Sequence, residues 1–222
     1  MKIEIKDLYS LEHTLAKEYL EGFTYPWEAL AGIGDLIIEL GNKLPEDEYD
    51  NPAENVWIAK DANLYNNTAY IKGPCIIGHE SEVRPGAFIR GNALVGNNCV
   101  VGNSTELKNV ILFDNVQVPH YNYVGDSILG YKAHMGAGSI TSNVKADKLN
   151  VVIKNGEEKI ETGRKKVGAM LADYAEIGCN SVLNPGTIIC KNSNVYPTSS
   201  VRGVVPENSI YKAEGRVVTK AN

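Results

Sequence analysis

The sequence lacks long apolar runs and any excess of basic residues. No stretch approaches the roughly 20 uncharged apolar residues of a membrane span, and the first twenty residues carry charge in every turn, without the apolar core of a signal peptide. The formal net charge is -5, whereas a nucleic-acid partner leaves a basic footprint. We therefore expect a cytoplasmic protein with neither a membrane nor a nucleic-acid partner.

Paired cysteines are also missing. Cys75, Cys99, Cys179 and Cys190 lie far apart with no CxxC spacing, and a chain of 222 residues buries enough surface to fold without disulfides. We expect all four to be reduced. Cys75 and Cys99 sit where the repeat described next places small inward side chains.

What the sequence has in abundance is a six-residue repeat of aliphatic side chains. Two runs keep the spacing without a slip, and further hexads with single-residue slips precede and separate them. The repeat positions are Ile58, Leu64, Ile71, Ile77, Val83, Ile89, Val95, Val101, Leu107, Leu112, Val118, Val124, Leu129, Met135, Thr141, Leu171, Ile177, Leu183, Ile189, Val195 and Val201, which makes 21 hexads.

A period of six fits neither a helix nor a simple alternating strand. A hexad of short strand and tight corner, with one aliphatic side chain turned inward, builds a triangular prism when three hexads complete a ring. Stacked rings pair as parallel strands about 4.8 Å apart. The sequence therefore predicts an all-β, single-stranded parallel β-helix of about seven coils over 55–205; a β-sandwich would separate its strands by about 8–12 residues instead.

Two segments depart from the repeat. Residues 1–54 should form a helical cap on the first coil and a linker, with Ser10 capping a first helix and Gly41 ending a second helix whose buried face is periodic. Residues 142–170 should carry a projecting hairpin that turns at Asn155-Gly156. Residues 206–222 are expected to form a C-terminal tail.

Four functional side chains interrupt the repeat, and stacking of the coils should bring them together. The hexads that begin at Val83 and Val118 are six apart in the count, so Arg84 and His120 within them should lie on one flank, two coils apart. Lys108 and Tyr123 follow the corner that closes this flank. Arginine and lysine together hold a phosphate monoester, histidine accepts a proton from an attacking amine, and a tyrosine hydroxyl orients substrate. Solvated charges and a corner histidine are the plainer interpretation of the same residues.

A family resemblance favours the functional interpretation. VRPGA (83–87), GNSTELKN (102–109), PHYNYVGDSILG (119–130) and GAGSITSN (136–143) resemble the acetyltransferase half of bifunctional N-acetylglucosamine-1-phosphate uridyltransferase/glucosamine-1-phosphate acetyltransferase and its archaeal relatives, over roughly residues 75–205. The resemblance implies left-handed coils, a homotrimer with sites between prisms, and acetyl-CoA as co-substrate with no metal.

The same resemblance assigns roles residue by residue. Arg84 and Lys108 match the residues that hold the sugar phosphate, His120 the catalytic base, and Tyr123 and Asn143 sugar-site residues. Lys148 is a looser match to a lysine of that site, because the local gap differs. Ala137 and Gly138 match the coil that runs along the pantetheine of the donor.

Three positions depart from the family pattern. His134 stands in place of an asparagine, either as a second donor near the acceptor or as a surface histidine, and Cys179 replaces a serine that contacts CoA. The C-terminal sequence keeps only a loose likeness to the CoA-binding tail; Arg202, Lys212 and Arg216 could meet CoA phosphates or be ordinary surface charges.

The resulting hypothesis is an acetyl-CoA-dependent N-acetyltransferase that acts on an amino-sugar 1-phosphate, with the amino sugar itself left open. A non-catalytic trimeric sugar-phosphate binder is the main alternative. A γ-carbonic-anhydrase-like hydrase would need three converging nitrogen ligands, of which His79 and His120 supply two. Nucleotidyl transfer is not expected, because residues 1–55 lack the glycine-rich turn and the α/β domain of that activity.

Overall fold

The computed structural model describes residues 1–65, 68–212 and 215–220. Its strands form a β-solenoid of about nine turns that matches the left-handed parallel β-helix expected. The expected seven coils are too few, because the ladders begin before Ile58 with a short hairpin and continue beyond Val201. None of the described helices has the length and hydrophobicity of a membrane span.

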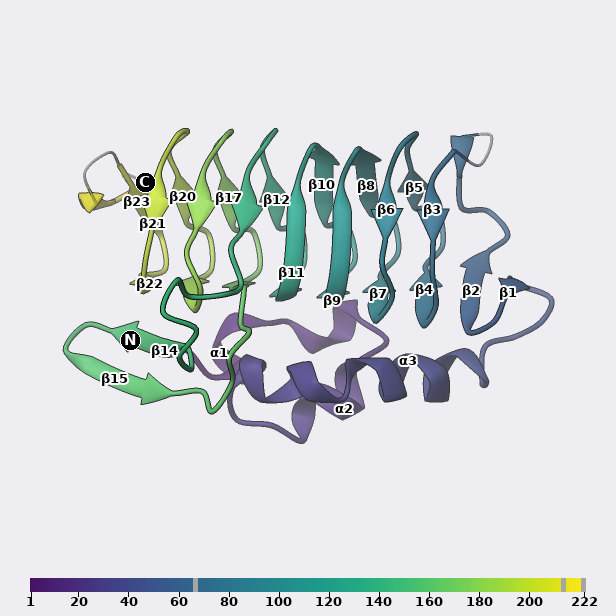
Figure 1. Ribbon diagram of the computed structural model, residues 1–222, viewed down its shortest axis with the longest axis horizontal. Helices are drawn as coiled ribbons and strands as arrows, with labels where there is room; N and C mark the ends of the chain where they lie inside the picture. Colours follow the sequence, from purple (N-terminus) through teal and green to yellow (C-terminus); the bar gives the residue numbers. More distant parts are fainter. Residues whose placement is uncertain (66–67, 213–214, 221–222) are drawn as a thin grey trace.

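The prism has three faces. The N-terminal segment packs on one of them, which we call the covered face (Figure 1). Its strands are β2 (Val56–Ala59), β4 (Cys75–Ile77), β7 (Ala93–Val95), the second halves of β9 (Glu106–Leu112) and β11 (Tyr123–Leu129), β16 (Ala169–Leu171), β19 (Thr187–Ile189) and β22 (Val204–Val205).

No helical layer covers the other two faces in the part of the chain that the structure describes (Figure 1). The open face comprises β3 (Tyr70–Ile71), β6 (Phe88–Ile89), the first halves of β9 and β11, β13 (Ile140–Thr141), β18 (Val182–Leu183) and β21 (Ser200–Val201). The third face comprises β5 (Glu82–Val83), β8 (Val100–Asn103), β10 (Gln117–His120), β12 (His134–Met135), β17 (Glu176–Ile177), β20 (Asn194–Val195) and β23 (Ser209–Tyr211).

The repeat residues point inward and close the core as the sequence predicts. Ile77, Val95 and Leu112 line the covered face from inside and are fully buried, as are Val83 and Val101 on the third face. Corners turn sharply because one residue at each adopts a left-handed backbone, which asparagine and glycine tolerate best. Asn92, Asn98, Asn109, Asn115, Asn180 and Asn192 all do so, with φ between 50° and 62°.

The N-terminal segment contains α1 (Ile5–Leu8), η1 (Leu11–His13), α2 (Lys17–Glu21), η2 (Pro26–Ala31) and α3 (Ile33–Gly41). The segment runs along the prism rather than over its first coil, since α3 packs on β4, β7 and β9 (Figure 1). The helix ends at Gly41, where only glycine fits, because an added Cβ would lie 2.3 Å from the Trp57 ring. Ser10 occupies the N-cap position of η1, but its side chain makes no capping bond: its N–H and hydroxyl donate to the buried Asp173 carboxylate at 2.8 and 2.7 Å.

The inserted hairpin consists of β14 (Val152–Asn155) and β15 (Glu158–Glu161). Asn155 pairs with Glu158, so the turn residues are Gly156 and Glu157, one position beyond the predicted turn, with Gly156 at φ 67°. The hairpin does not project freely, because Val151 and Ile153 are fully buried and β14 packs near β22. The N-terminal segment and the inserted hairpin thus together cover the outward side of this face.

The expected tail is partly structured. β23 continues the third face and pairs with β24 (Val217–Thr219) in an antiparallel ladder, so the solenoid extends past residue 205. Residues 213–214 and 221–222 of this tail lie outside the described residues. At the other end, β1 (Tyr49–Ala53) pairs antiparallel with β2.

Candidate functional site

The open face presents two rows of outward side chains in register across consecutive coils. Phe88, Glu106 and Tyr123 form one row, because these residues pair directly in β6, β9 and β11. In the second row Arg90 lies opposite Lys108, since the Arg90 amide donates to the Leu107 carbonyl at 2.8 Å. Rungs about 4.8 Å apart put the side chains within reach of one another.

Three of the sequence-predicted residues meet around a carboxylate that the sequence analysis missed. The ammonium of Lys108 lies 3.1 Å from both oxygens of Asp126. The side-chain amide of Asn143 donates to Asp126 at 2.6 Å and to the Tyr123 hydroxyl at 3.2 Å. Asp126 occupies the corner between the open and covered faces and is 3% exposed. An isolated aspartate in a corner gives no sequence signal that separates it from a turn residue.

The Tyr123 hydroxyl stays protonated and can donate a hydrogen bond. Burial raises the pKa of Tyr123 above its usual value, and the Asp126 and Glu106 carboxylates act in the same direction, against Asn143 and Arg90. Because its oxygen accepts from Asn143, the O–H bond is available to a ligand. The ring lies over Gly125, where an added Cβ would come 2.5 Å from the hydroxyl oxygen.

The structure does not bring Arg84 to Lys108. Arg84 lies on the third face and forms an ion pair with Glu82 at 3.0 Å. Arg84 precedes Lys108 by four hexads, one more than a full ring, so the two residues fall on neighbouring faces. It shares its sheet with His120, as expected, but their strands are two rungs apart with β8 between them.

Arg90 is the arginine that lies beside Lys108. It precedes Lys108 by three hexads, which is one complete coil, and its guanidinium pairs with Glu106 at 2.6 Å. It also lies 5.8 Å from the centre of the Phe88 ring. The spacing of one coil was the signal that could have identified it in the sequence.

His120 lies at the corner between the third and open faces, which we call the His120 corner. Its backbone carbonyl accepts from the Gly138 amide at 2.9 Å, and the Ala137 carbonyl accepts from the Asn180 amide at 2.8 Å. His120, Ala137 and Cys179 therefore stack in successive coils along one edge, next to Tyr123. Both His120 and Cys179 are exposed.

Asn122 holds the His120 corner in place. Its Oδ1 accepts from the His120 amide at 3.1 Å, and its Nδ2 donates to the Gly136 and Ser139 carbonyls of the next coil at 2.9 and 3.1 Å. The imidazole itself has no hydrogen-bond partner within the described residues. The corner therefore fixes the backbone of His120 and leaves its ring free to meet a ligand.

The remaining candidates lie away from this cluster. Lys148 is exposed in a turn of the insertion, where its amide donates to the Lys145 carbonyl. His134 is on the third face and its Nδ1 pairs with Glu176 at 2.8 Å. Arg202 donates to the Asn184 side chain at 3.2 Å on the open face, and Lys212 lies 5.6 Å from the Tyr196 ring centre.

Histidines do not converge as a hydrase would require. The Nδ1 of His79 lies 3.1 Å from Asp61 and its Nε2 lies 3.5 Å from Glu48, at a different corner from His120. Across residues 1–65, 68–212 and 215–220, no group of His, Cys, Asp or Glu has the arrangement of a metal site.

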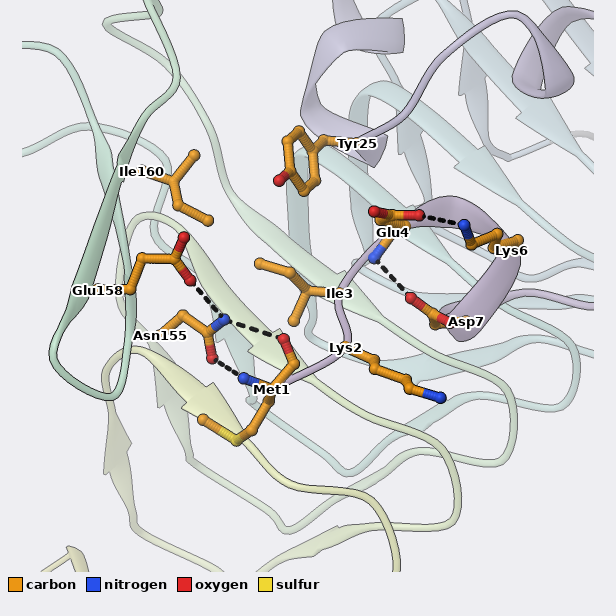
Figure 2. Close-up of a pocket in the computed structure, with 10 residues that line it drawn as sticks. All are labelled: Met1, Lys2, Ile3, Glu4, Lys6, Asp7, Tyr25, Asn155, Glu158 and Ile160. Carbon is orange, nitrogen blue, oxygen red and sulfur yellow. Dashed lines mark hydrogen bonds and ion pairs between the residues drawn. The ribbon is translucent and has the colours of Figure 1, made fainter.

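A hollow of about 370 Å³ lies between the N-terminus and the hairpin, away from these residues (Figure 2). Its polar groups satisfy each other. The Met1 amine donates to Asn155 Oδ1 at 2.7 Å, Asn155 Nδ2 donates to the Met1 carbonyl at 2.9 Å, and Glu4 pairs with Lys6 at 2.6 Å (Figure 2). We regard this hollow as the seam between segment and hairpin.

Comparison with known proteins identifies relatives that match most of the chain. The bifunctional protein GlmU of Methanococcus maripaludis (strain C5) is 32% identical over 221 residues, which is 98% of this chain and 53% of that protein. The chain is a homologue of the GlmU-type bifunctional proteins. A second relative, the bifunctional sugar-1-phosphate nucleotidylyltransferase/acetyltransferase of Sulfurisphaera tokodaii, is 31% identical over 177 residues, covering 72% of this chain and 44% of the relative.

The chain spans about half the length of the GlmU-type relatives that it matches. A family model described as the GMPPB C-terminal domain matches residues 71–156. Among solved structures, a variant of the Bacillus cereus N-acyltransferase AntD, in complex with dTDP-4-amino-4,6-dideoxyglucose and coenzyme A, has a TM-score of 0.43 at 17% identity and covers 76% of this chain and 81% of that one.

Proposed function

We propose that this GlmU homologue transfers an acetyl group from acetyl-CoA to the amine of an amino-sugar 1-phosphate. The observation that carries the proposal is the cluster of Arg90, Lys108, Tyr123 and Asn143 on the open face, beside the corner that bears His120. Two cations in adjacent coils suit a phosphate monoester, and the neighbouring hydroxyl and amide suit a sugar.

In this proposal the residues divide the tasks of binding and catalysis among them. Arg90 and Lys108 hold the phosphate, and Arg90 takes the role that sequence resemblance gave to Arg84. Tyr123 and Asn143 contact the sugar, while Ala137, Gly138 and Cys179 lie along the donor at the His120 corner. Lys148 keeps only its sequence match, because its side chain has no hydrogen bond or ion pair with the cluster in the described part of the chain.

The reaction follows from these positions. The sugar amine attacks the thioester carbonyl, and His120 accepts the proton that the amine loses. The carbonyl oxygen becomes an oxyanion, which the Tyr123 hydroxyl or a backbone amide stabilises. Collapse breaks the carbon–sulfur bond, and the departing thiolate of CoA takes the proton back from His120. No metal ion takes part in these steps.

A homotrimer with sites between prisms is part of the proposal. Large side chains remain exposed near the His120 corner and on the open face: Tyr70 is 63%, Tyr121 62% and Tyr196 46% exposed. Exposed aromatic side chains of this kind gather at interfaces between proteins. Light scattering of the purified chain should give three times the monomer mass, and a monomer would contradict this part.

Release of free thiol tests the reaction directly. Purified protein is mixed with acetyl-CoA and either glucosamine or galactosamine 1-phosphate, and CoA is titrated with a thiol reagent. We expect release with at least one sugar and a loss of about 10²- to 10⁴-fold in His120→Ala. The Sulfurisphaera tokodaii relative is named as a nucleotidylyltransferase/acetyltransferase, which supports the choice of donor.

The competing proposal is a sugar-phosphate binder without catalysis. Two observations favour it: Cys179 stands where the family has a serine, and no second side chain of the described residues orients the His120 ring. A binder would take up glucosamine 1-phosphate in calorimetry, show no heat with acetyl-CoA, and release no thiol. That combination would replace the acetyltransferase proposal.

A further inference from the structure

Asp126 is buried at the corner between the open and covered faces. Its backbone is left-handed, with φ 49°, and its side chain is only 5% exposed. Aspartate and asparagine adopt this conformation more readily than most residues, so the backbone alone would accept either. The charge of the side chain therefore needs an explanation beyond the turn.

Three donors from two coils converge on this carboxylate. Lys108 contacts both oxygens at 3.1 Å, Asn109 Nδ2 donates to Oδ1 at 3.0 Å, and Asn143 Nδ2 donates to Oδ2 at 2.6 Å. All are side chains of the candidate site or its immediate neighbours. Lysine has a long, flexible stem with three donors, so a fixed carboxylate removes much of the freedom of its ammonium.

The same carboxylate connects the site to the rest of the chain. Asn109 Nδ2 also donates to the Leu30 carbonyl of the N-terminal segment at 3.1 Å. The segment that returns from the insertion contacts the corner through its backbone, since the Gly168 amide donates to the Asp126 carbonyl at 2.8 Å and the Val167 amide to the Asn143 carbonyl at 3.1 Å. The corner is thus held from both sides while its carboxylate faces the site.

We infer that Asp126 is a positioning residue: it fixes the Lys108 ammonium and the Asn143 amide, and through Asn143 the Tyr123 hydroxyl, in the arrangement that receives the acceptor. The inference rests on the proposed function, because it assigns these three groups to the acceptor. Asp126 does not contact the substrate. Its effect is to set the direction of groups that do.

The first test measures Lys108 without using activity. Partial modification of surface amines, followed by peptide mass spectrometry, gives the relative reactivity of each lysine in the native protein. In Asp126→Asn, we expect Lys108 to react several times faster while other lysines keep their rates. Glu82→Gln is the matched control, because it removes an acid that pairs with Arg84 on the third face and should leave Lys108 unchanged.

The second test uses steady-state kinetics in a double-mutant cycle. Asp126→Asn should lower kcat/KM for the sugar phosphate at least tenfold in the wild type but less than threefold when Lys108 is already Met, with KM for acetyl-CoA unchanged. A role confined to stability would lower the unfolding midpoint and leave both KM values and kcat per folded molecule intact.

The outcomes separate the two proposals. Equal Lys108 reactivity in wild type and Asp126→Asn, or equal kinetic effects in both backgrounds, would overturn the positioning role. Thiol release absent in the wild type would overturn the proposed reaction, and the amine-reactivity test would still decide whether Asp126 fixes Lys108.

Discussion

The covered and open faces are built from the same backbone ladder but carry opposite outward surfaces. On the covered face the outward row is aliphatic and buried: Ile76, Ile111, Ile128, Met170 and Ile188 are all fully inaccessible. On the open face the outward rows contain Arg90, Glu106, Lys108 and Tyr123. The outward residues alone therefore decide whether a face is sealed by the chain or left for a ligand.

The residues within each hexad, and not only the repeat position, indicate which face is covered. Hexads on the covered face contain three apolar or small residues in a row, as in CII (75–77), ALV (93–95) and AML (169–171), whereas open-face hexads alternate. A continuous apolar strand needs cover on both sides. The N-terminal segment and the hairpin provide that cover.

The largest expected effect compares truncations on the two faces. Ile111→Ala should destabilise the protein by about 2–5 kcal/mol, because it opens a cavity beneath α3. Phe88 is 40% exposed on the open face, so Phe88→Ala should lower the free energy of unfolding by about 1 kcal/mol or less. Urea unfolding of both variants measures the difference, and equal losses would mean that the N-terminal segment does not seal the face.

A second effect distinguishes the two arginines. Arg90→Met should raise KM for the amino-sugar phosphate roughly 10- to 100-fold, as expected for loss of a charged contact to phosphate. Arg84→Met, its match on the third face, should change KM less than about threefold. If Arg84→Met proves the more harmful variant, the phosphate is held elsewhere.

A third, smaller effect concerns the Tyr123 hydroxyl. An alanine at position 125 places its Cβ where the hydroxyl now lies, so Gly125→Ala should displace the ring from Asn143. We expect kcat to fall roughly tenfold, as for the loss of one hydrogen bond worth about 1.4 kcal/mol. Full activity would show that Tyr123 does not need its present position.

The smallest effect is expected from the cysteines. Burial raises the pKa of the Cys99 thiol to about 12 and of Cys190 to about 11, so neither forms appreciable thiolate at pH 8. Iodoacetamide should modify exposed Cys179 in the native protein and leave Cys75, Cys99 and Cys190 intact. Acetyl-CoA should slow this reaction if the donor lies along the His120 corner, and Cys179→Ser should change activity less than about threefold.

The inward half of the molecule was predictable because one aliphatic residue every six positions leaves few alternatives. Outward contacts were harder, since they depend on which coil and which face each residue reaches. Arg84 illustrates the problem: its motif matched the family, yet its spacing of four hexads from Lys108 puts it around a corner. No local pattern predicts contacts between distant segments. The roles of Asp126 and Ser10, and the packing of α3 on β4, β7 and β9, all depend on such contacts.

A crystal structure with glucosamine 1-phosphate and CoA would test the account most directly. We expect the phosphate within hydrogen-bond distance of Arg90 and Lys108 on the open face, with the sugar amine turned toward His120. A phosphate bound on the third face beside Arg84, or an amine facing away from the His120 corner, would contradict it.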